Sequence, residues 1–437
     1  MKMARTLRIL SFTLACLVFL GLVAVSRSRG SSNGDVCKSS DSHCFVDKFS
    51  TLRLSRVEPI KVGHVRNVEL EPGKHYQMKT LALQPPIYEI PDFLSAEECD
   101  HIISLAEKQG LKNSSTVGDS LEKDIESLGS NSKEEFVYWD MDNSSMIDLD
   151  EMLKGLELNV DFIPERNHVL QMYSETGIDK NNDGLISLEE FLHRNKTEIA
   201  IFVRRVKTVL PHTRSRYSSQ AWLDNTGDPI MNNIQRRVQK LTQLPMELIQ
   251  ASEYLQVVSY SHNGHYNCHL DSDFPQRDKE CCHILNTDKS NCRICRYLTV
   301  LYFLNDVEEG GETAFPVADN TTFDEKVWIR DEESLCNLAK NCHKANVVAK
   351  PIKGKAIMWY NHLTDERTQW MGGLDHLSFH GGCDVIKGRK WIANNWISVS
   401  NNRKQDIWNW IDLAPEESVQ QIKTGEDQSR PWKNEEL

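Results

Sequence analysis

The sequence has no excess of positive charge, and this absence excludes one class of partner. Its 51 lysine and arginine residues are outnumbered by 63 aspartate and glutamate residues, giving a net charge of −12. Because an acidic surface is repelled by a phosphate backbone, we expect no binding to nucleic acid. Apolar residues are scarce at 39%, but 14 Phe, 11 Tyr and 10 Trp can build a core, which excludes wholesale disorder. At 437 residues, the chain predicts two or more units.

One long hydrophobic run lies near the N-terminus of this otherwise polar sequence. Residues 9–25 are seventeen consecutive positions without a charge, which is the short end of a membrane span. We predict an uncleaved transmembrane anchor rather than a cleaved signal peptide, because Ala24-Val25-Ser26 is a weak cleavage site. Basic residues flank the run on both sides, so the positive-inside rule leaves its orientation nearly balanced.

Cysteines and glycosylation sequons favour the secretory pathway for the rest of the chain. Eleven of the twelve cysteines follow the anchor, which is many for a cytosolic enzyme. Asn-x-Ser/Thr sequons occur at Asn113, Asn143, Asn195 and Asn320. We therefore predict that residues 1–8 are cytoplasmic and that residues 26–78 form a lumenal linker.

The negative charge is concentrated in one segment, where two calcium-binding loops are expected. Residues 117–200 hold twenty acidic and seven basic residues, so this stretch alone carries a net −13. Two twelve-residue runs inside it place oxygen ligands at positions 1, 3, 5, 7, 9 and 12, which is the EF-hand pattern. Two matches in tandem argue against an acidic loop with accidental spacing. The predicted ligands are Asp140, Asp142, Ser144, Met146, Asp148 and Glu151 in the first loop and Asp179, Asn181, Asp183, Leu185, Ser187 and Glu190 in the second.

The two loops are unequal. The second has Gly184 at the sharp turn, where the first has Ser145, which must accept a positive φ at some cost. We therefore expect tighter binding at the second loop. Ile147 and Ile186 occupy position 8 of each loop, where paired EF-hands form a short two-stranded contact. Glycosylation of Asn143 would compete with calcium in the first loop.

The C-terminal half changes to short β-rich runs separated by turns. Strands are predicted at 255–260, 297–304, 356–360 and 391–398, where β-branched and aromatic residues gather. Several short strands without intervening helical periods favour a sandwich or jelly roll.

A candidate metal site lies within this β-rich half. His269 and Asp271 are two residues apart, so on a strand both side chains face one side. His380 can supply the third ligand, and two histidines with one carboxylate leave positions open on non-haem Fe(II) for a 2-oxo acid and dioxygen. Lys390 follows His380 by ten residues, where it could pair with the far carboxylate of 2-oxoglutarate.

The remaining cysteines predict disulfides rather than a zinc site. Cys281, Cys282, Cys292 and Cys295 lack the spacing of two CxxC knuckles, because one pair is adjacent. We expect Cys336 and Cys342 to bridge locally or nearby, and Cys37 with Cys44. The connection at 272–295 borders the metal site and is a candidate lid over a peptide.

At this point the sequence resembles a known family, the prolyl 4-hydroxylases among the Fe(II)/2-oxoglutarate dioxygenases. The resemblance covers most of residues 80–400. It is carried by PIYEIPDFLSAEECDHIISLAE at 86–107, LQVVSYSHNGHYNCHLDSD at 255–273, RYLTVLYFLNDVEEGGETAFP at 296–316 and HGGCDVIKGRKWIANNWI at 380–397.

The resemblance implies a role for each matching residue. His269, Asp271 and His380 would ligate iron, and Lys390 would bind the C5 carboxylate of 2-oxoglutarate. Tyr266 and Thr299 match positions that help to hold the same cosubstrate. The reaction would be 4-hydroxylation of a peptidyl proline, coupled to conversion of 2-oxoglutarate and O2 to succinate and carbon dioxide, with ascorbate keeping the iron reduced.

The order of anchor, EF-hand pair and core resembles the membrane-anchored branch of this family. That likeness implies a single-pass type II protein of the endoplasmic reticulum membrane with a lumenal catalytic domain. It also implies a proline-containing protein substrate, the α subunit of hypoxia-inducible factor being the one associated with that branch. The residues also leave two other functions open. The protein could be a calcium-binding protein with a vestigial dioxygenase fold, or a hydroxylase of another residue such as lysine.

The expected fold is therefore α+β. A double-stranded β-helix (jelly-roll) core with flanking helices is joined to an N-terminal transmembrane helix and an inserted α-helical EF-hand pair. The expected divisions after the linker are the first part of the hydroxylase domain at 79–126, the EF-hand pair at 127–200, the catalytic domain at 201–400 and a tail at 401–437.

Overall fold

The computed structural model describes residues 53–114, 120–224, 227–276, 279–282, 292–324, 336–400 and 406. All of them belong to one compact unit. The predicted anchor at 9–25, the Cys37–Cys44 bridge and nearly all of the tail lie outside the described residues. Within these ranges, no helix is both long and apolar enough to cross a membrane.

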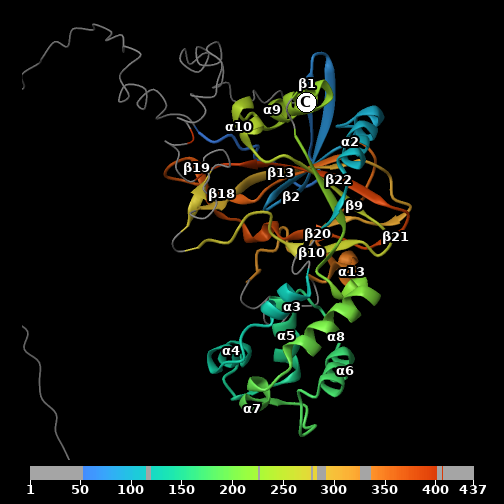
Figure 1. Cartoon of the computed structure of the whole chain (residues 1–437). Coiled ribbons are helices and arrows are strands. Elements are labelled where there is room, and N and C mark those ends of the chain that lie inside the picture. The colour runs from blue at the N-terminus through green and yellow to red at the C-terminus, as the bar shows by residue number, and fades with distance from the viewer. Residues whose placement is uncertain are drawn as a thin grey trace, which may run out of the picture. The chain divides into compact units, whose positions relative to one another are not determined.

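A nine-stranded antiparallel sheet forms the larger part of the β core (Figure 1). The four strands predicted from sequence are neighbours in this sheet and lie at or within one residue of their predicted bounds. They are buried along nearly their whole length, because both faces of the sheet are covered. In order across the sheet the strands are β1 (Val65–Glu71), β2 (Lys74–Leu83), β3 (Pro86–Ile90), β17 (Ala356–Tyr360), β13 (Arg296–Phe303), β22 (Lys390–Ser398), β9 (Leu255–Tyr260), β8 (Ser219–Leu223) and β4 (Lys112–Asn113).

The assignment of residues 26–78 to a linker is wrong for its last part. Residues 65–71 form β1, and residues 74–83 form β2, the two being joined by a tight turn at Gly73 with a φ of 74°. Inward-facing apolar residues alternate with charged residues along both strands, so one face packs on the core while the other meets solvent. A short alternation of apolar and charged residues is a weak strand signal, and such a segment is easily mistaken for a polar linker.

A second, five-stranded sheet faces the first and carries the candidate metal ligands. The main core lies between the sheets, where Phe315 and Ala349 of the small sheet pack with Val258, Leu301 and Trp359 of the large one. This two-layer β core with helices confirms the α+β class. The strands of the small sheet, in order, are β16 (Val347–Ala349), β15 (Thr313–Phe315), β20 (His380–Gly382), β10 (His265–His269) and β7 (Arg216–Tyr217).

Three helices pack against the large sheet: α2 (Ala96–Gln109), α9 (Pro229–Thr242) and α10 (Met246–Ala251) (Figure 1). Helix α2 begins at a capping box, in which Ser95 and Glu98 satisfy each other's backbone N–H groups. The buried guanidinium of Arg237 on α9 pairs with Glu98 at 2.5 Å and with Glu71 of β1 at 3.2 Å. These ion pairs fix the helices to the sheet edge.

The acidic segment folds as a helical module with its own apolar core. Phe136, Trp139, Met172, Phe191 and Phe202 are buried together at its centre. A two-stranded pair, β5 (Met146–Ile147) and β6 (Ile186–Ser187), joins the two predicted loops with Ile147 opposite Ile186, which confirms the expected contact. The helices are α3 (Leu121–Ser127), α4 (Lys133–Trp139), α5 (Leu149–Val160), α6 (Arg166–Thr176), α7 (Leu188–Leu192) and α8 (Lys196–Val209).

Short elements complete the described structure. Three further two-stranded pairs connect loops, and the remaining helices are single turns. They are β11 (Glu280–Cys282) with β12 (Cys292–Ile294), β14 (Glu309–Gly310) with β21 (Val385–Lys387), β18 (His362–Asp365) with β19 (Trp370–Leu374), and the helices η1 (Pro211–Thr213), α13 (Leu338–Asn341), η3 (Cys342–Lys344) and η4 (His376–Ser378).

Disulfides tie α13 to both strands that bear predicted histidine ligands. Cys336 bonds Cys268, which precedes His269, and Cys342 bonds Cys383, which follows β20. Cys336 and Cys342 thus do not pair with each other, because a helical turn separates them and each faces a different strand. A third bond joins Cys281 to Cys295, and Cys292 is also disulfide-bonded, as expected in place of zinc.

Candidate active site

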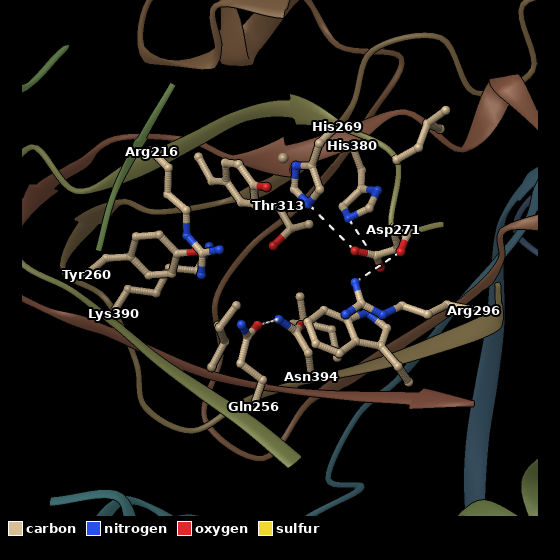
Figure 2. Close-up of a pocket in the computed structure, with 17 residues that line it drawn as sticks. Arg216, Gln256, Tyr260, His269, Asp271, Arg296, Thr313, His380, Lys390 and Asn394 are labelled. Carbon is tan, nitrogen blue, oxygen red and sulfur yellow. Dashed lines mark hydrogen bonds and ion pairs between the residues drawn. The ribbon is translucent and has the colours of Figure 1, made fainter. Parts of the chain in front are cut away.

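The three predicted metal ligands meet where β10 and β20 lie side by side. His269 ends β10 and is paired in antiparallel register with His380, which begins β20. Asp271 lies in a bend two residues beyond β10, so the expected shared strand face is replaced by a turn that brings the carboxylate back. The Nε2 atoms of both histidines are 3.6 Å from the Asp271 carboxylate, each from a different oxygen (Figure 2).

Both imidazoles are oriented by their other ring nitrogen. Nδ1 of His269 is 3.0 Å from the carbonyl oxygen of Asn267, and Nδ1 of His380 is 2.9 Å from that of Ser378. A carbonyl oxygen can only accept, so each Nδ1 carries a proton, and Nε2 is the ring atom that faces Asp271. One donor atom from each of the three residues lies within 4.8 Å of the others. Two imidazole nitrogens and a carboxylate in this arrangement fit a divalent iron.

The Asp271 carboxylate is buried but held ionised. Although burial opposes its charge, His380 and His269 keep the pKa of Asp271 far below its usual range. Thr299 on β13 donates a 2.6 Å hydrogen bond from Oγ1 to Oδ2 of Asp271. The Arg296 guanidinium also contacts Asp271: its Nη1 atom donates to the Asp271 backbone carbonyl oxygen at 3.0 Å. The ligand is therefore fixed from two sides.

A cavity of about 180 Å³ opens in front of the triad, and Lys390 lies in its wall (Figure 2). The Lys390 side chain is 1% exposed, and burial lowers its pKa to about 7. Nζ lies 3.4 Å from the carbonyl oxygen of Glu312, with the ring of Tyr260 at 5.2 Å. A buried ammonium across a polar cavity from a metal triad suits a ligand with two anionic ends.

The structure brings Tyr266 to the cavity but gives Thr299 a different place. The Tyr266 ring stacks on that of His269 with centroids 3.7 Å apart, and it lines the cavity. Thr299 is fully buried behind Asp271, where its Oγ1 also accepts from Nδ2 of Asn361 at 2.9 Å. These are the contacts of a residue that positions Asp271, rather than those of a cosubstrate ligand.

Several polar residues of the cavity were missed from sequence. Gln256 of β9 and Asn394 of β22 are cross-strand partners, and Asn394 Nδ2 donates to Gln256 Oε1 at 3.0 Å. Alternate residues of a strand face the same side, so a strand that points Lys390 into the cavity also points Asn394 into it. This pattern could have identified Asn394 from the sequence. Arg216 and Arg296 also line it, but each begins a strand, where no alternation precedes it.

The first predicted calcium loop gathers carboxylates around a common point. Donor atoms of Asp140, Asp142 and Glu151 lie within 4.8 Å of one another. Glu151 Oε1 accepts from the backbone N–H groups of Met141 and Asp142 at 2.7 and 3.0 Å. Ser145 takes the expected positive φ, at 71°.

The second loop repeats the hydrogen bonds from backbone N–H groups to its first and last carboxylates. Asp179 accepts from the Gly184 N–H at 2.9 Å, and Glu190 accepts from the Lys180 N–H at 2.9 Å. Gly184 has a φ of 81°. Both loops thus wrap their backbone around the first and last carboxylates, a geometry that suits a hard dication.

The fold and the site together define an Fe(II)- and 2-oxoglutarate-dependent oxygenase. The family model for the 2OG-Fe(II) oxygenase superfamily matches residues 255–398, from β9 to the end of β22, and so contains the triad and Lys390. Fe(II) and 2-oxoglutarate are the cofactor and cosubstrate of this class.

Relatives narrow the class further. The chain is 38% identical over 356 residues to the transmembrane prolyl 4-hydroxylase of Mus musculus, covering 80% of this chain and 70% of that one. It is 36% identical over 384 residues to the transmembrane prolyl 4-hydroxylase of Homo sapiens, covering 86% and 75%. Prolyl 4-hydroxylase 2 of Arabidopsis thaliana is 34% identical over 186 residues, covering 43% of this chain and 54% of that one.

The chain belongs to the transmembrane prolyl 4-hydroxylase family. It is an Fe(II)- and 2-oxoglutarate-dependent enzyme that acts on proline, which decides against a vestigial dioxygenase and against a lysine hydroxylase.

Proposed function

We propose that His269, Asp271 and His380 bind the iron and that Lys390 binds the C5 carboxylate of 2-oxoglutarate. The observation that supports this most is the buried triad with three donor atoms within 4.8 Å, which shares its cavity with a buried lysine. When bound, iron and 2-oxoglutarate together activate dioxygen for oxidation of a carbon–hydrogen bond. Ascorbate would keep the metal reduced between turnovers.

The chain's own residues would prepare the site for this chemistry. The carbonyl groups of Asn267 and Ser378 hold the imidazole protons on Nδ1, so that Nε2 is the coordinating atom. Tyr266, stacked on His269, would lie beside the bound 2-oxoglutarate. Binding of the dianion would draw a proton onto Lys390 and replace water in the cavity.

The direct test is turnover of 2-oxoglutarate to succinate by the purified protein with Fe(II), ascorbate and a proline-containing peptide. We expect His269→Ala to abolish both turnover and Fe(II) binding. A matched control is His262→Ala, because His262 is exposed and hydrogen-bonds the Ile386 carbonyl group, away from the triad. Fe(II) binding that survives the His269 substitution would overturn the ligand assignment.

The helical module is proposed to be an EF-hand pair that binds one calcium ion in each loop. Its support is the shared wrapping of backbone N–H groups around Glu151 and Glu190, together with the β5–β6 pair. Calorimetric titration should find two sites in the intact protein. Glu151→Gln should remove one and Glu190→Gln the other, whereas two sites in either variant would contradict the assignment.

The cellular setting is proposed from the sequence and from the relatives. Residues 9–25 would anchor the protein in the endoplasmic reticulum membrane as a single-pass type II protein, with the enzyme in the lumen. The substrate would be a prolyl residue in a protein, the α subunit of hypoxia-inducible factor being the candidate that the resemblance suggests. Mass spectrometry of proteins from cells with and without an intact His269 would identify the substrate.

A further inference from the structure

A continuous path of hydrogen bonds connects the end of α5 to the imidazole of His269. Oδ1 of Asp161 accepts from the backbone N–H of Ser215 at 2.9 Å. The carbonyl oxygen of Ser215 accepts from the N–H of Asn267 at 2.7 Å. The carbonyl oxygen of Asn267 is the group that holds Nδ1 of His269 at 3.0 Å. Three steps therefore separate the calcium-loop module from an iron ligand.

The Asp161 end of this path is held firmly. Asp161 is the C-cap of α5, has a left-handed backbone with a φ of 51°, and is 8% exposed. The carbonyl oxygen of the preceding Val160 accepts from Nζ of Lys207 at 3.0 Å. Two residues further on, the Ile163 N–H donates to Thr213 at 2.8 Å. The end of α5 is thus fixed to the segment that leads into β7.

The Asn267 end is equally constrained. Asn267 is 6% exposed, and its Oδ1 accepts from the backbone N–H of Leu338 on α13 at 3.1 Å. Its neighbour Cys268 is bonded to Cys336. With both its side chain and its N–H engaged, Asn267 has little freedom to turn its carbonyl group away from His269.

At its other end, α5 begins inside the first calcium loop. Asp148 is the N-cap, and Glu151, the third residue of the helix, supplies the last carboxylate of the loop. A twelve-residue helix is about 18 Å long, so α5 spans the distance from the first loop to Asp161. One helix therefore joins two predicted ligands of the first loop, Asp148 and Glu151, to Asp161.

We propose that Asp161 is a positioning residue for His269 and that it couples calcium in the first loop to iron affinity. The inference rests on the proposed function, in which His269 binds iron and the first loop binds calcium. Loss of the Asp161 carboxylate removes the acceptor of the Ser215 N–H and so weakens, through Ser215, the hold on the Asn267 carbonyl group that fixes the imidazole. Partners that orient a metal-bound histidine are worth about 10-fold or more in metal affinity.

The test uses two substitutions that separate the acceptor from the backbone. Asp161→Gly keeps the left-handed cap but removes the acceptor, whereas Asp161→Asn keeps both. Gln243→Gly is the matched control, because Gln243 is the left-handed C-cap of α9, with a φ of 57°. Anaerobic calorimetric titration of the full chain with Fe(II) and 2-oxoglutarate, with and without added calcium, measures the metal affinity directly.

We expect Asp161→Gly to weaken Fe(II) binding about 10-fold, and Asp161→Asn and Gln243→Gly to match the native protein. Calcium should tighten Fe(II) binding in the native protein but not in Asp161→Gly. Native affinity and calcium response in Asp161→Gly, or equal losses in the Gly and Asn variants, would overturn the proposal. Failure of the native protein to bind Fe(II), or retention of binding by His269→Ala, would instead overturn the proposed function.

Discussion

Thr299 Oγ1 lies 2.6 Å from Oδ2 of Asp271 and donates the hydrogen bond that holds this carboxylate toward the two histidines. The hydroxyl group has no exposure to solvent, and its own acceptor position is taken by Asn361. Thr299 therefore acts through Asp271, and substitutions can distinguish this role from direct contact with 2-oxoglutarate.

Replacement of Thr299 by valine should lower Fe(II) affinity about 10-fold, because the carboxylate loses its fixed partner. Thr299→Ser keeps the donor and should restore the affinity. The measurement is calorimetric titration with Fe(II), accompanied by the KM for 2-oxoglutarate. An increase in KM with unchanged Fe(II) affinity would show that Thr299 contacts the cosubstrate after all.

The affinity for 2-oxoglutarate should fall as the pH rises above 7. Burial lowers the pKa of Lys390 to about 7, so the free enzyme loses the lysine charge above that pH. Because the dianion is bound by the ammonium form, the dissociation constant should rise about 10-fold per pH unit there. Lys390→Met should bind weakly and without this slope. A slope that persists in Lys390→Met would assign it to another group.

Stability should also depend on pH through His265. Nε2 of this fully buried residue faces the carbonyl oxygen of Arg214 at 2.8 Å, and Nδ1 faces Asp384 and Asn263, both at 3.0 Å. Only acceptors surround the ring, so the doubly protonated form is the one that fits. Although burial opposes the charge, Asp384 and the carbonyl groups raise the pKa of His265 above 6.5.

A raised pKa in the folded state contributes stability that is complete below pH 6.5 and is lost as the pH rises through the folded value. The free energy of unfolding, measured in urea, should fall across that window by at most about 1.4 kcal/mol per pH unit. His265→Gln cannot carry the charge, so its slope should be smaller. Equal slopes in the two proteins would show that His265 does not supply the dependence.

Substitution of Ser145 by glycine should stabilise the helical module. Ser145 has a φ of 71°, close to the 81° of Gly184 at the same position of the second loop. Removing the side chain relieves the left-handed backbone by about 1 kcal/mol. Thermal unfolding should show a higher Tm, and Gly184→Ala should show the opposite change. Calcium affinity at the first loop should rise in parallel.

Much of the large sheet could be predicted from sequence because its central strands are long and apolar. Strands β9, β13, β17 and β22 each carry five or more consecutive strand residues, most of them buried. The small sheet gave no such signal, since β15 and β20 have only three residues each. Strands this short are set by their neighbours rather than by their own pattern.

The candidate site also contains some residues that the sequence predicts and others that depend on the fold. The two histidines, Asp271 and Lys390 could be proposed from sequence because of their spacing and charge, and the structure brings them to one cavity. The contacts of Arg296 and Thr299 with Asp271 depend on which residues the fold places beside that carboxylate, and no local pattern predicts them. Disulfide pairing has the same origin, because Cys336 and Cys342 find partners that are distant in sequence.

The two disulfides that flank α13 give the candidate metal site a covalent tether that is independent of the sheet. From Cys268 the path runs through Cys336, along α13 to Cys342, and across to Cys383. If the strands separate, His269 and His380 still remain at the ends of one short cross-linked loop. The effective concentration of one histidine near the other stays high, so the two can come together again without a search along the whole chain.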